Sequence, residues 1–230
     1  MSEKLGTVIV TGGASGLGAA VARAVHGSDG TPVIVDRQEP ENGHGLFERV
    51  DLVRTREAEA AVRRIGERAD GIDAVVTAAG IDACGRLDQV DAERWEQVVA
   101  VNLLGTAAVV RAALPYLERS AGQVVTVAST LGLRALSDAT AYCSSKFGVV
   151  GFSRALAAET TGRVGVTCLI PGGMQTAFFD GRDERYKPPP DADLASPDDV
   201  AEAVLFALTR PNGTQLRELI VTPTHETSWP

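Results

Sequence analysis

The sequence predicts a single α/β domain in which a mostly parallel sheet of seven strands carries helices on both faces. Short runs of valine and isoleucine alternate along the chain with longer amphipathic stretches. These runs are almost continuously apolar, which is typical of strands that are covered on both faces. Alternating strands and helices join by right-handed crossovers into a doubly wound sheet. With 230 residues, of which 44% are hydrophobic and 23% charged, the chain suits one domain over residues 1–230.

Each short apolar run is expected to form a strand. The clearest runs are TVIV, PVIV, IDAVVT, QVVTVA, VGVTCLI and ELIV, at residues 7–10, 32–35, 72–77, 123–128, 164–170 and 218–221. A weaker run, LFERV at residues 46–50, fits between the second strand and the second helix. Together these runs account for the seven strands of the sheet.

Helical patterns occupy the intervals between the strands. They are expected at residues 16–26, 54–68, about 91–118, about 140–159 and 197–209. The last one begins with Ser196 and Pro197, which suit an N-cap and a first helical turn. The segment 177–197 is rich in charge and proline. Because this kind of fold binds ligands beyond the carboxyl ends of its strands, we interpret that segment as a substrate loop.

Charge and composition exclude several classes of function. The net charge is −8 and the basic residues form no tract, so we expect no nucleic-acid partner and no membrane partner. No uninterrupted apolar run approaches the roughly 18 residues of a membrane span, and the first residues do not have the layout of a signal peptide. The three cysteines lie far apart and the three histidines show no ligand spacing. We therefore expect a cytoplasmic protein with no disulfide framework and no metal.

A glycine-rich turn follows the first strand. The stretch from Thr7 to Ala20 reads TVIVTGGASGLGAA, in which Gly12, Gly16 and Gly18 have the spacing G-x-x-x-G-x-G. The usual dinucleotide fingerprint is G-x-G-x-x-G, whose glycines allow a tight turn and close approach to the pyrophosphate at a helix N-terminus. The longer spacing keeps these requirements. Taken alone, the segment also fits a flexible loop after a strand.

Two aspartates follow the second and third strands. Asp36 stands eighteen residues after Gly18, where an acidic residue can bind the adenosine ribose hydroxyls, although aspartate also ends many strands because it favours turns. Asp51 fits a place beside the adenine ring. It fits equally well as the N-cap of the helix that begins near Arg54.

The strongest chemical signal is the pair formed by Tyr142 and Lys146. They stand four residues apart on an expected helix and therefore share one face. A tyrosine with a pKa near 10 is a poor acid or base at neutral pH, but a nearby ammonium lowers that pKa, and Lys146 supplies this charge. Ser129 follows the strand QVVTVA at its carboxyl end, where its hydroxyl can hold a carbonyl oxygen. Asn102 is a polar residue among apolar ones and needs an inward partner or an exposed position.

Together these residues resemble the short-chain dehydrogenase/reductase family over nearly the whole chain. The family's T-G-x-x-x-G-x-G loop, helix asparagine, strand-end serine, Y-x-x-x-K pair and P-G motif are matched in order by Thr11, Gly12, Gly16, Gly18, Asn102, Ser129, Tyr142, Lys146, Pro171 and Gly172. Thr176 stands where the family contacts the nicotinamide carboxamide. The resemblance implies a Rossmann-like domain, and it explains the longer glycine loop as the form that this family uses for a nicotinamide dinucleotide.

The resemblance also implies a reaction and a set of site residues. Hydride passes between the nicotinamide and a secondary alcohol or ketone, Tyr142 exchanges the proton, Ser129 orients the oxygen, Lys146 holds the nicotinamide ribose, and Asn102 positions a proton-carrying water. The cofactor is expected to contact Gly12, Ser15, Gly16, Leu17, Gly18, Asp36, Arg37, Asp51, Leu52, Ala79, Gly80, Tyr142, Lys146, Pro171, Gly172 and Thr176.

We expect the cofactor to be NAD(H), with NADP(H) as the alternative. Asp36 suits both ribose hydroxyls and repels a 2′-phosphate as a like charge. Arg37, next in sequence, is able to offset part of that repulsion. Against this, Ala14 and Ser15 leave the glycine loop without the basic residue that phosphate-binding members often carry.

The sequence departs from the family pattern in two places. After the fourth strand it has TAAG at residues 77–80, so Thr77 replaces the asparagine that braces the sheet in the family. The chain ends in IVTPTHETSWP instead of the usual glycine-rich close, which puts the C-terminal contacts and the subunit contacts in doubt. By the same resemblance we expect a homodimer or homotetramer, with Ala108, Ala112, Gly148 and Phe152 facing a second subunit.

Two other functions stay open at this point. A protein of this fold can bind a dinucleotide as a catalytically silent or redox-sensing subunit. A nucleotide-sugar epimerase or dehydratase shares the tyrosine and lysine but normally needs a longer C-terminal region. The residues expected around the substrate are mostly apolar, with Arg134 as a candidate anchor for an anionic group, so the identity of the small-molecule alcohol or ketone stays undetermined.

Overall fold

The computed structural model describes residues 5–41, 44–211 and 213–228. Seven strands form one parallel sheet in the order β3-β2-β1-β4-β5-β6-β7. Their bounds are β1 Thr7–Thr11, β2 Thr31–Asp36, β3 Leu46–Arg49, β4 Ala74–Thr77, β5 Gln123–Val127, β6 Gly165–Pro171 and β7 Glu218–Val221. The predicted α/β fold class is confirmed, and each strand lies within two residues of its expected ends.

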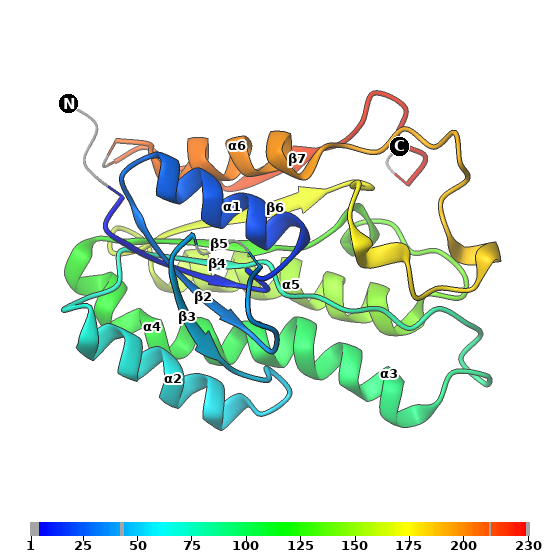
Figure 1. The fold of residues 1–230 in the computed structure, drawn as a ribbon, viewed down its shortest axis with the longest axis horizontal. Helices are drawn as coiled ribbons and strands as arrows, with labels where there is room; N and C mark the ends of the chain where they lie inside the picture. The colour runs from blue at the N-terminus through cyan, green and yellow to red at the C-terminus, as the bar shows by residue number, and fades with distance from the viewer. Residues whose placement is uncertain (1–4, 42–43, 212, 229–230) are drawn as a thin grey trace.

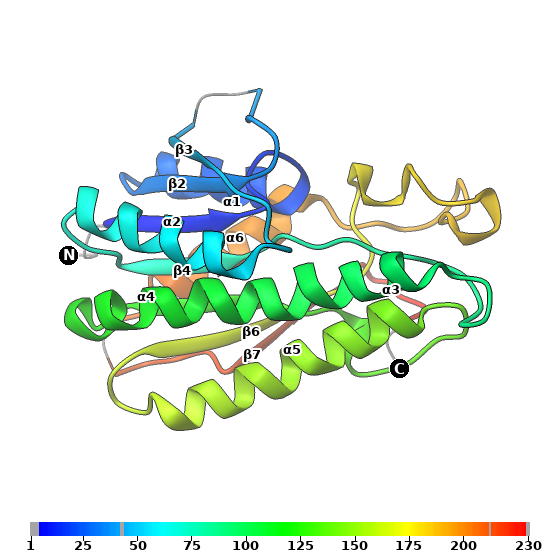
Figure 2. The same cartoon turned by 90° about the horizontal axis from the view of Figure 1, so that it is seen from below.

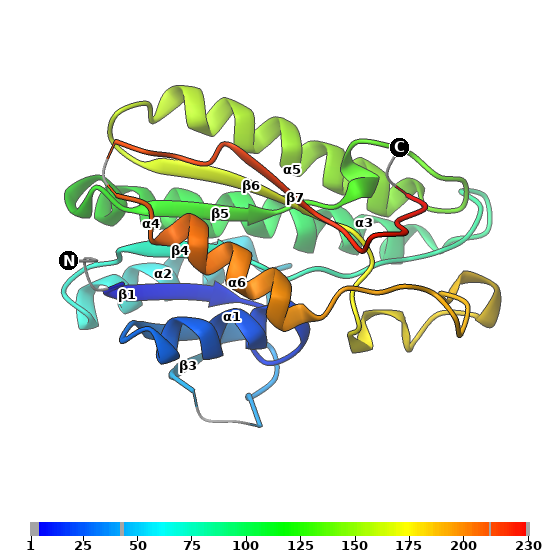
Figure 3. The ribbon, with the colours of Figure 1, turned by 90° about the horizontal axis from the view of Figure 1, so that it is seen from above.

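Helices cover both faces of this sheet (Figure 1). Their bounds are α1 Gly16–Gly27, α2 Thr55–Arg68, α3 Ala92–Val99, α4 Thr106–Ser120, α5 Thr140–Glu159 and α6 Pro197–Leu208. Helices α2, α4 and α5 lie on one face (Figure 2), and α1 packs beside α6 on the other (Figure 3). Each face has its own apolar core, because both sides of the central strands are buried.

The order of the strands determines where a ligand can bind. The chain runs from β1 outward to β3, returns to β4 beside β1, and then continues outward to β7. At this reversal the connections after β1 and β4 separate to opposite faces and leave a crevice at the carboxyl ends of the strands. Figure 1 shows the segment 177–197, which we expect to be the substrate loop, in gold and projecting beyond that same edge.

The expected helix at 91–118 is not a single α-helix. It consists of α3, a π-helical turn at Ala100–Gly105, and α4. A π-helical turn accommodates an extra residue within a helix and is frequent at functional sites. Hydrophobic periodicity reveals the helix but not this turn, because one widened turn changes the pattern very little.

The run Ala92–Ser120 also has more apolar character than the sequence analysis recognised. By length and composition it could cross a membrane, with a mean hydropathy of 1.7 in its most apolar window, but 56% of that window is buried inside the domain. Ala108 and Ala112 are both buried, so the expectation that they face a second subunit is wrong. The exposed apolar side chains nearby are Leu104, before α4, and Phe147, on α5.

Candidate active site

The glycine loop between β1 and α1 is closely packed on its neighbours. Gly12 and Gly16 have φ angles of +68° and +51°, a region that favours glycine. A Cβ atom on Gly12 would lie 2.7 Å from the Cα of Ala79, and one on Gly18 would lie 2.1 Å from the Gly12 carbonyl oxygen. A Cβ atom on Gly16 would lie 3.4 Å from Thr176. The loop therefore brings the ends of β1, β4 and β6 together.

Helix α1 begins directly at this loop. Ser15 is its N-cap, and its side chain makes no capping hydrogen bond. The first turn contains no acidic side chain, and Leu17 is buried under it. The free N–H groups and the positive end of the helix dipole are therefore available to an anion such as a pyrophosphate.

Asp36, at the end of β2, lies against the same loop. Its Oδ2 accepts a hydrogen bond from the Ala14 N–H at 3.1 Å, and its Oδ1 accepts one from the Gln38 N–H at 3.0 Å. Arg37 is exposed, and its carbonyl accepts a hydrogen bond from Arg49 at 2.7 Å. The structure thus places Asp36 next to the glycine loop, as a ribose-binding role requires.

Asp51 forms a turn after β3. Its Oδ1 accepts a hydrogen bond from the Val53 N–H at 3.1 Å. The N-cap of α2 is Arg54, without a side-chain capping bond, so Asp51 is not the cap of this helix. Leu52 beside it is buried, and a Cβ atom on Gly105 would lie 2.9 Å from its Cβ.

The sequence TAAG, which departs from the family pattern, covers the last residue of β4 and the three residues that follow it. Ala79 donates its backbone N–H to the Thr11 hydroxyl at 3.2 Å, which ties this segment to β1. Thr77 is paired with Thr11 of β1 and Thr126 of β5. Its buried Oγ1 has no hydrogen-bond partner among the described residues. This short side chain makes no side-chain bridge to the neighbouring strands.

Asn102, in the π-helical turn, joins two parts of the site. Its Oδ1 accepts from the Ile81 N–H at 2.9 Å, and its Nδ2 donates to the Ile81 carbonyl and to the Ser145 hydroxyl, both at 3.0 Å. Ser145 in turn donates to the Tyr142 carbonyl at 2.8 Å. Sequence reasoning missed Ser145, although it stands within the Y-x-x-x-K motif. The buried amide thus fixes the segment after β4 relative to α5.

The three residues expected to carry the chemistry lie together. Tyr142 and Lys146 share one face of α5, with Lys146 Nζ 5.6 Å from the centre of the Tyr142 ring. Nζ donates a hydrogen bond to the Val127 carbonyl at 2.8 Å, so the end of β5 holds the ammonium. Ser129 follows β5, its Oγ accepts from the Leu131 N–H at 3.1 Å, and its hydroxyl lies near enough to Tyr142 to influence the pKa of that residue.

The pKa values at this cluster differ from the expectation. Burial raises the pKa of Tyr142 to about 12, opposed by the hydrogen bond with Ser129. Burial lowers the pKa of Lys146 to about 8. The expected lowering of the tyrosine pKa by Lys146 is therefore not seen, since desolvation of the phenolate outweighs the favourable effects around it. At neutral pH the tyrosine is protonated and most of the lysine is charged.

The P-G motif follows β6 and meets the C-terminal segment. Gly172 donates to the Val221 carbonyl at 2.9 Å, and Gly173 donates to Glu226 Oε2 at 2.8 Å. Burial acts to raise the pKa of Glu226, but hydrogen bonds from Ser228, Gly173 and Thr227 outweigh it and hold that pKa below its usual value. The atypical C-terminus thus packs on this chain's own site, which sequence reasoning did not predict.

The C-terminal segment also reaches the turn that contains Ser129. The hydroxyls of Ser228 and Thr130 lie 2.6 Å apart. Arg134, the candidate anchor for an anion, donates to the Thr227 carbonyl at 3.2 Å. Beyond the P-G motif, Thr176 caps the short helix Ala177–Phe179 that opens the substrate loop.

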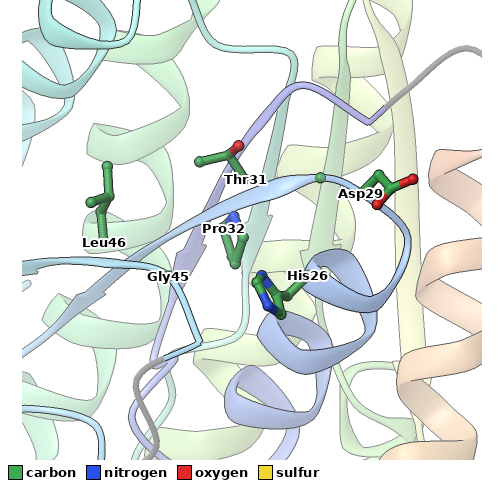
Figure 4. A pocket seen from close by; sticks show the side chains of 7 residues that line it. His26, Asp29, Thr31, Pro32, Gly45 and Leu46 are labelled. Carbon is green, nitrogen blue, oxygen red and sulfur yellow. The ribbon is translucent and has the colours of Figure 1, made fainter.

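A separate surface hollow of about 340 Å³ lies at the opposite edge of the sheet. Figure 4 shows its lining, which comes from the end of α1 and the starts of β2 and β3. His26 lies in the last turn of α1, and its ring centre is 5.5 Å from that of His44. Because the hollow is at the amino ends of the strands, it is not part of the site described above.

Comparisons with known proteins agree with this geometry. A family model described as short chain dehydrogenase matches residues 6–187. An uncharacterized oxidoreductase of Staphylococcus aureus (strain MW2) is 30% identical over 228 residues, covering 94% of this chain and 96% of the relative. One from Staphylococcus saprophyticus is 30% identical over 230 residues, with the same coverage.

Two solved structures show the same fold. The aldohexose dehydrogenase of Thermoplasma acidophilum is 22% identical, with a TM-score of 0.84 and coverage of 94% of this chain and 92% of that one. An alcohol dehydrogenase from the archaeon Thermococcus sibiricus, complexed with 5-hydroxy-NADP, is 25% identical, with a TM-score of 0.82 and coverage of 93% and 94%.

Proposed function

The chain belongs to the short-chain dehydrogenase family, and on that premise we propose that this oxidoreductase transfers a hydride between a nicotinamide cofactor and a secondary alcohol or its ketone. The observation that carries the proposal is the meeting of Ser129, Tyr142 and Lys146 beside the glycine loop. An acid–base hydroxyl, a second hydroxyl and an ammonium at the carboxyl edge of the sheet are suited to proton exchange with a carbonyl oxygen.

The residues present fit a nicotinamide dinucleotide. The glycine loop is closed against Ala79 and Thr176, with a helix N-terminus for the pyrophosphate and Asp36 for the adenosine ribose. When bound, the cofactor supplies or accepts the hydride. We assign the nicotinamide end to Pro171, Gly172 and Thr176.

Tyr142 acts as the acid in the direction of ketone reduction. Its raised pKa of about 12 keeps the hydroxyl protonated near neutral pH, so the proton is available to the carbonyl oxygen. In alcohol oxidation the same oxygen must accept a proton. Ser129 then holds the substrate oxygen beside Tyr142, because its hydroxyl hydrogen is not used by the bond that it accepts from Leu131.

Lys146 and Asn102 support this exchange. The ammonium is held by the Val127 carbonyl, and in the proposed complex it would bind the nicotinamide ribose. Asn102 already donates both of its amide hydrogens and accepts one hydrogen bond. Its proposed water therefore binds to the second lone pair of Oδ1, and its larger contribution is to position the segment after β4 and α5.

We assign the cofactor as NAD(H). Asp36 supports this assignment, since it would meet a 2′-phosphate as a like charge. NADP(H) stays the alternative because Arg37 is exposed beside it, and because the Thermococcus alcohol dehydrogenase is complexed with 5-hydroxy-NADP. Comparison of the two cofactors in steady-state kinetics separates these assignments.

We further propose that the enzyme acts as a homodimer or homotetramer in the cytoplasm. The exposed Leu104 and Phe147, 52% and 44% exposed, are the apolar side chains that a second subunit would cover. Cys84, Cys143 and Cys168 are all free, which suits a reducing compartment. Sedimentation as a monomer at micromolar concentration would contradict the oligomer.

The experiment that tests the proposal is a turnover screen of the purified protein. Both cofactors, oxidised and reduced, are offered with 3-oxoacyl thioesters, steroid-like ketones and small cyclic alcohols. The proposal predicts cofactor-dependent turnover of at least one carbonyl or alcohol class, and its loss in Tyr142→Phe with cofactor affinity retained. Cofactor binding without turnover of any substrate would favour the catalytically silent alternative.

A further inference from the structure

A buried ion pair joins the segment after β4 to the substrate loop. Arg182 Nη2 lies 2.6 Å from Asp82 Oδ2, and their side chains are 18% and 7% exposed. Among the ion pairs of the described residues, no other has both side chains less than one-fifth exposed. Surface pairs contribute little, whereas breaking a buried pair leaves a charge without a partner. This contact is therefore a buried charged tie between the loop and the domain, in addition to the hydrogen bond from the Tyr186 hydroxyl to Asp138 at 3.0 Å.

The Asp82 carboxylate is fully engaged on its own side. Its Oδ1 accepts from the Ala83 N–H at 2.6 Å, and its Oδ2 also accepts from the Cys84 thiol at 3.2 Å. Burial and the nearby Asp82 charge raise the pKa of Cys84 to about 12, so this thiol stays a protonated donor. Asp82 is thus a fixed, negatively charged anchor next to the segment that Asn102 holds.

The Arg182 guanidinium packs against the two phenylalanine rings at the start of the substrate loop. Its central carbon lies 5.0 Å from the Phe178 ring centre and 4.6 Å from that of Phe179. Its Nη1 donates to the Tyr186 carbonyl at 3.2 Å, while its buried Nε has no acceptor among the described residues. The polar contacts of this side chain among the described residues are therefore those with Asp82 and one carbonyl.

Phe178 lies between Arg182 and Tyr142 and contacts both of them. The centres of the Phe178 and Tyr142 rings are 5.7 Å apart, with an angle of 53° between the rings. A continuous series of contacts thus runs from Asp82 through Arg182 and Phe178 to Tyr142. Movement of Arg182 would remove the apolar wall beside the reacting oxygen.

The two charges also act on Tyr142 in opposite directions. The Asp82 charge raises the pKa of the tyrosine and the Arg182 charge lowers it. Ser129 after β5 and Cys143 on α5 also act on the pKa of the phenol, and Lys146 Nζ lies 5.6 Å from the centre of the ring. With both partners present the two charge effects on the phenol oppose each other, and that of Asp82 is the larger.

We propose that Asp82 and Arg182 are positioning residues for the proposed reaction, holding Phe178 against Tyr142 as an apolar wall of the substrate pocket while each partner opposes the charge of the other. The proposal rests on the proposed function for its kinetic part only. Because the pair satisfies its charges internally, the substrate group that lies on this wall is apolar or aromatic, not anionic.

The test is a charge cycle made of Arg182→Met, Asp82→Asn and the double variant. Hydrogen exchange of residues 177–187 in the protein without added ligand reports the position of the loop. In each single variant the amides of residues 177–187 should exchange roughly tenfold faster or more, because the remaining charge is left buried without a partner. Lys187→Met is the matched control, since it removes an exposed ion pair with Glu184 in the same loop and should exchange as the wild type does.

The kinetic part uses the pH dependence of alcohol oxidation, which requires Tyr142 to lose its proton. Arg182→Met should move the rise in rate to higher pH, Asp82→Asn should move it to lower pH, and the double variant should return close to the wild type. KM for an apolar substrate should rise about tenfold in both single variants. A merely structural role would move both pH profiles in the same direction, and that result overturns the charge argument.

Hydrogen exchange tests the positioning of the loop and kinetics test the proposed function, so either claim can be refuted without the other. If the amides of residues 177–187 exchange in Arg182→Met at the wild-type rate, the positioning argument is overturned, even where turnover is normal. If the wild type turns over nothing while the single variants still loosen the loop, the positioning holds and the proposed function fails. Should one single variant not fold, the neutral double variant and Arg182→Lys, which keeps the charge, provide the comparison.

Discussion

Gly18→Ala should damage cofactor binding more than it damages the fold. The added Cβ would lie 2.1 Å from the Gly12 carbonyl oxygen and 2.6 Å from the carbonyl carbon. Ordinary contacts between carbon and oxygen are about 3.3–3.6 Å, so the loop and helix must separate by about 1 Å. The Gly12 side of this contact is the loop that would hold the pyrophosphate, which is therefore displaced from the helix N-terminus.

The expected effect on stability is moderate. Overpacking of this kind costs about 1–3 kcal/mol, and replacing glycine by alanine inside a helix returns about 1 kcal/mol. The net loss of about 0–2 kcal/mol corresponds to a fall in Tm of up to about 8 °C for a chain of this size. Since the protein stays folded, a loss of dinucleotide affinity can be measured directly.

Gly27→Ala in the same helix is the matched control. Nothing lies within 4 Å of a Cβ atom at that position. The assay is the Kd for dinucleotide by calorimetry together with thermal unfolding. Gly18→Ala should bind at least about tenfold more weakly, because hydrogen bonds to a charged group contribute about 1.5–3 kcal/mol each, and Gly27→Ala should bind as the wild type does. Equal Kd values for the two variants would refute the assignment of this loop to the cofactor.

Three further predictions concern charged groups. The pKa of Lys146 is about 8 and that of Tyr142 is about 12. The rate of ketone reduction should therefore fall above about pH 8, because Lys146 loses its proton there while Tyr142 keeps its own. A rate that stays constant up to pH 10 contradicts this prediction. Asp36→Ala should lower the preference for NADH over NADPH in kcat/KM by up to about 1000-fold, since a like-charge pair at about 4 Å costs about 4 kcal/mol; an unchanged ratio places Asp36 away from the ribose. The pKa of Glu226 is lowered from its usual value of 4.5. The contact of residues 222–228 with the domain should therefore be fully stable above about pH 4.5, and it should be lost as the pH falls through the lowered pKa of Glu226. Hydrogen exchange of that segment should rise under acid and in Glu226→Gln, and no response to either change excludes the docking.

Elements with strong patterns were predictable from the sequence. The five inner strands β2, β1, β4, β5 and β6 are largely buried on both faces and therefore read as continuous apolar runs. The turn around Asn102 was not predictable, because hydrophobic periodicity does not distinguish a widened helical turn from a regular one. The family resemblance suggested outward positions at Ala108 and Ala112, which the structure buries.

The site was predictable where its residues lie in short motifs, and not where they pair across long distances in sequence. The spacing of Tyr142 and Lys146 indicates that they share a helix face, but it carries no information about desolvation, which raises one pKa and lowers the other. The contact between Asp82 and Arg182 joins residues that are 100 positions apart. Their partnership depends on how the substrate loop folds back over β4.

The most direct test of the central claim is isotope transfer from the cofactor to the substrate. Purified wild-type protein is incubated with nicotinamide cofactor deuterated at the reactive C4 position and with the ketone panel, and the products are analysed by mass spectrometry. The account predicts an alcohol that carries one deuterium at the former carbonyl carbon, with the signal lost in Tyr142→Phe although that variant still binds the cofactor. Absence of deuterium from every product of the wild type, or an undiminished signal in Tyr142→Phe, would contradict it.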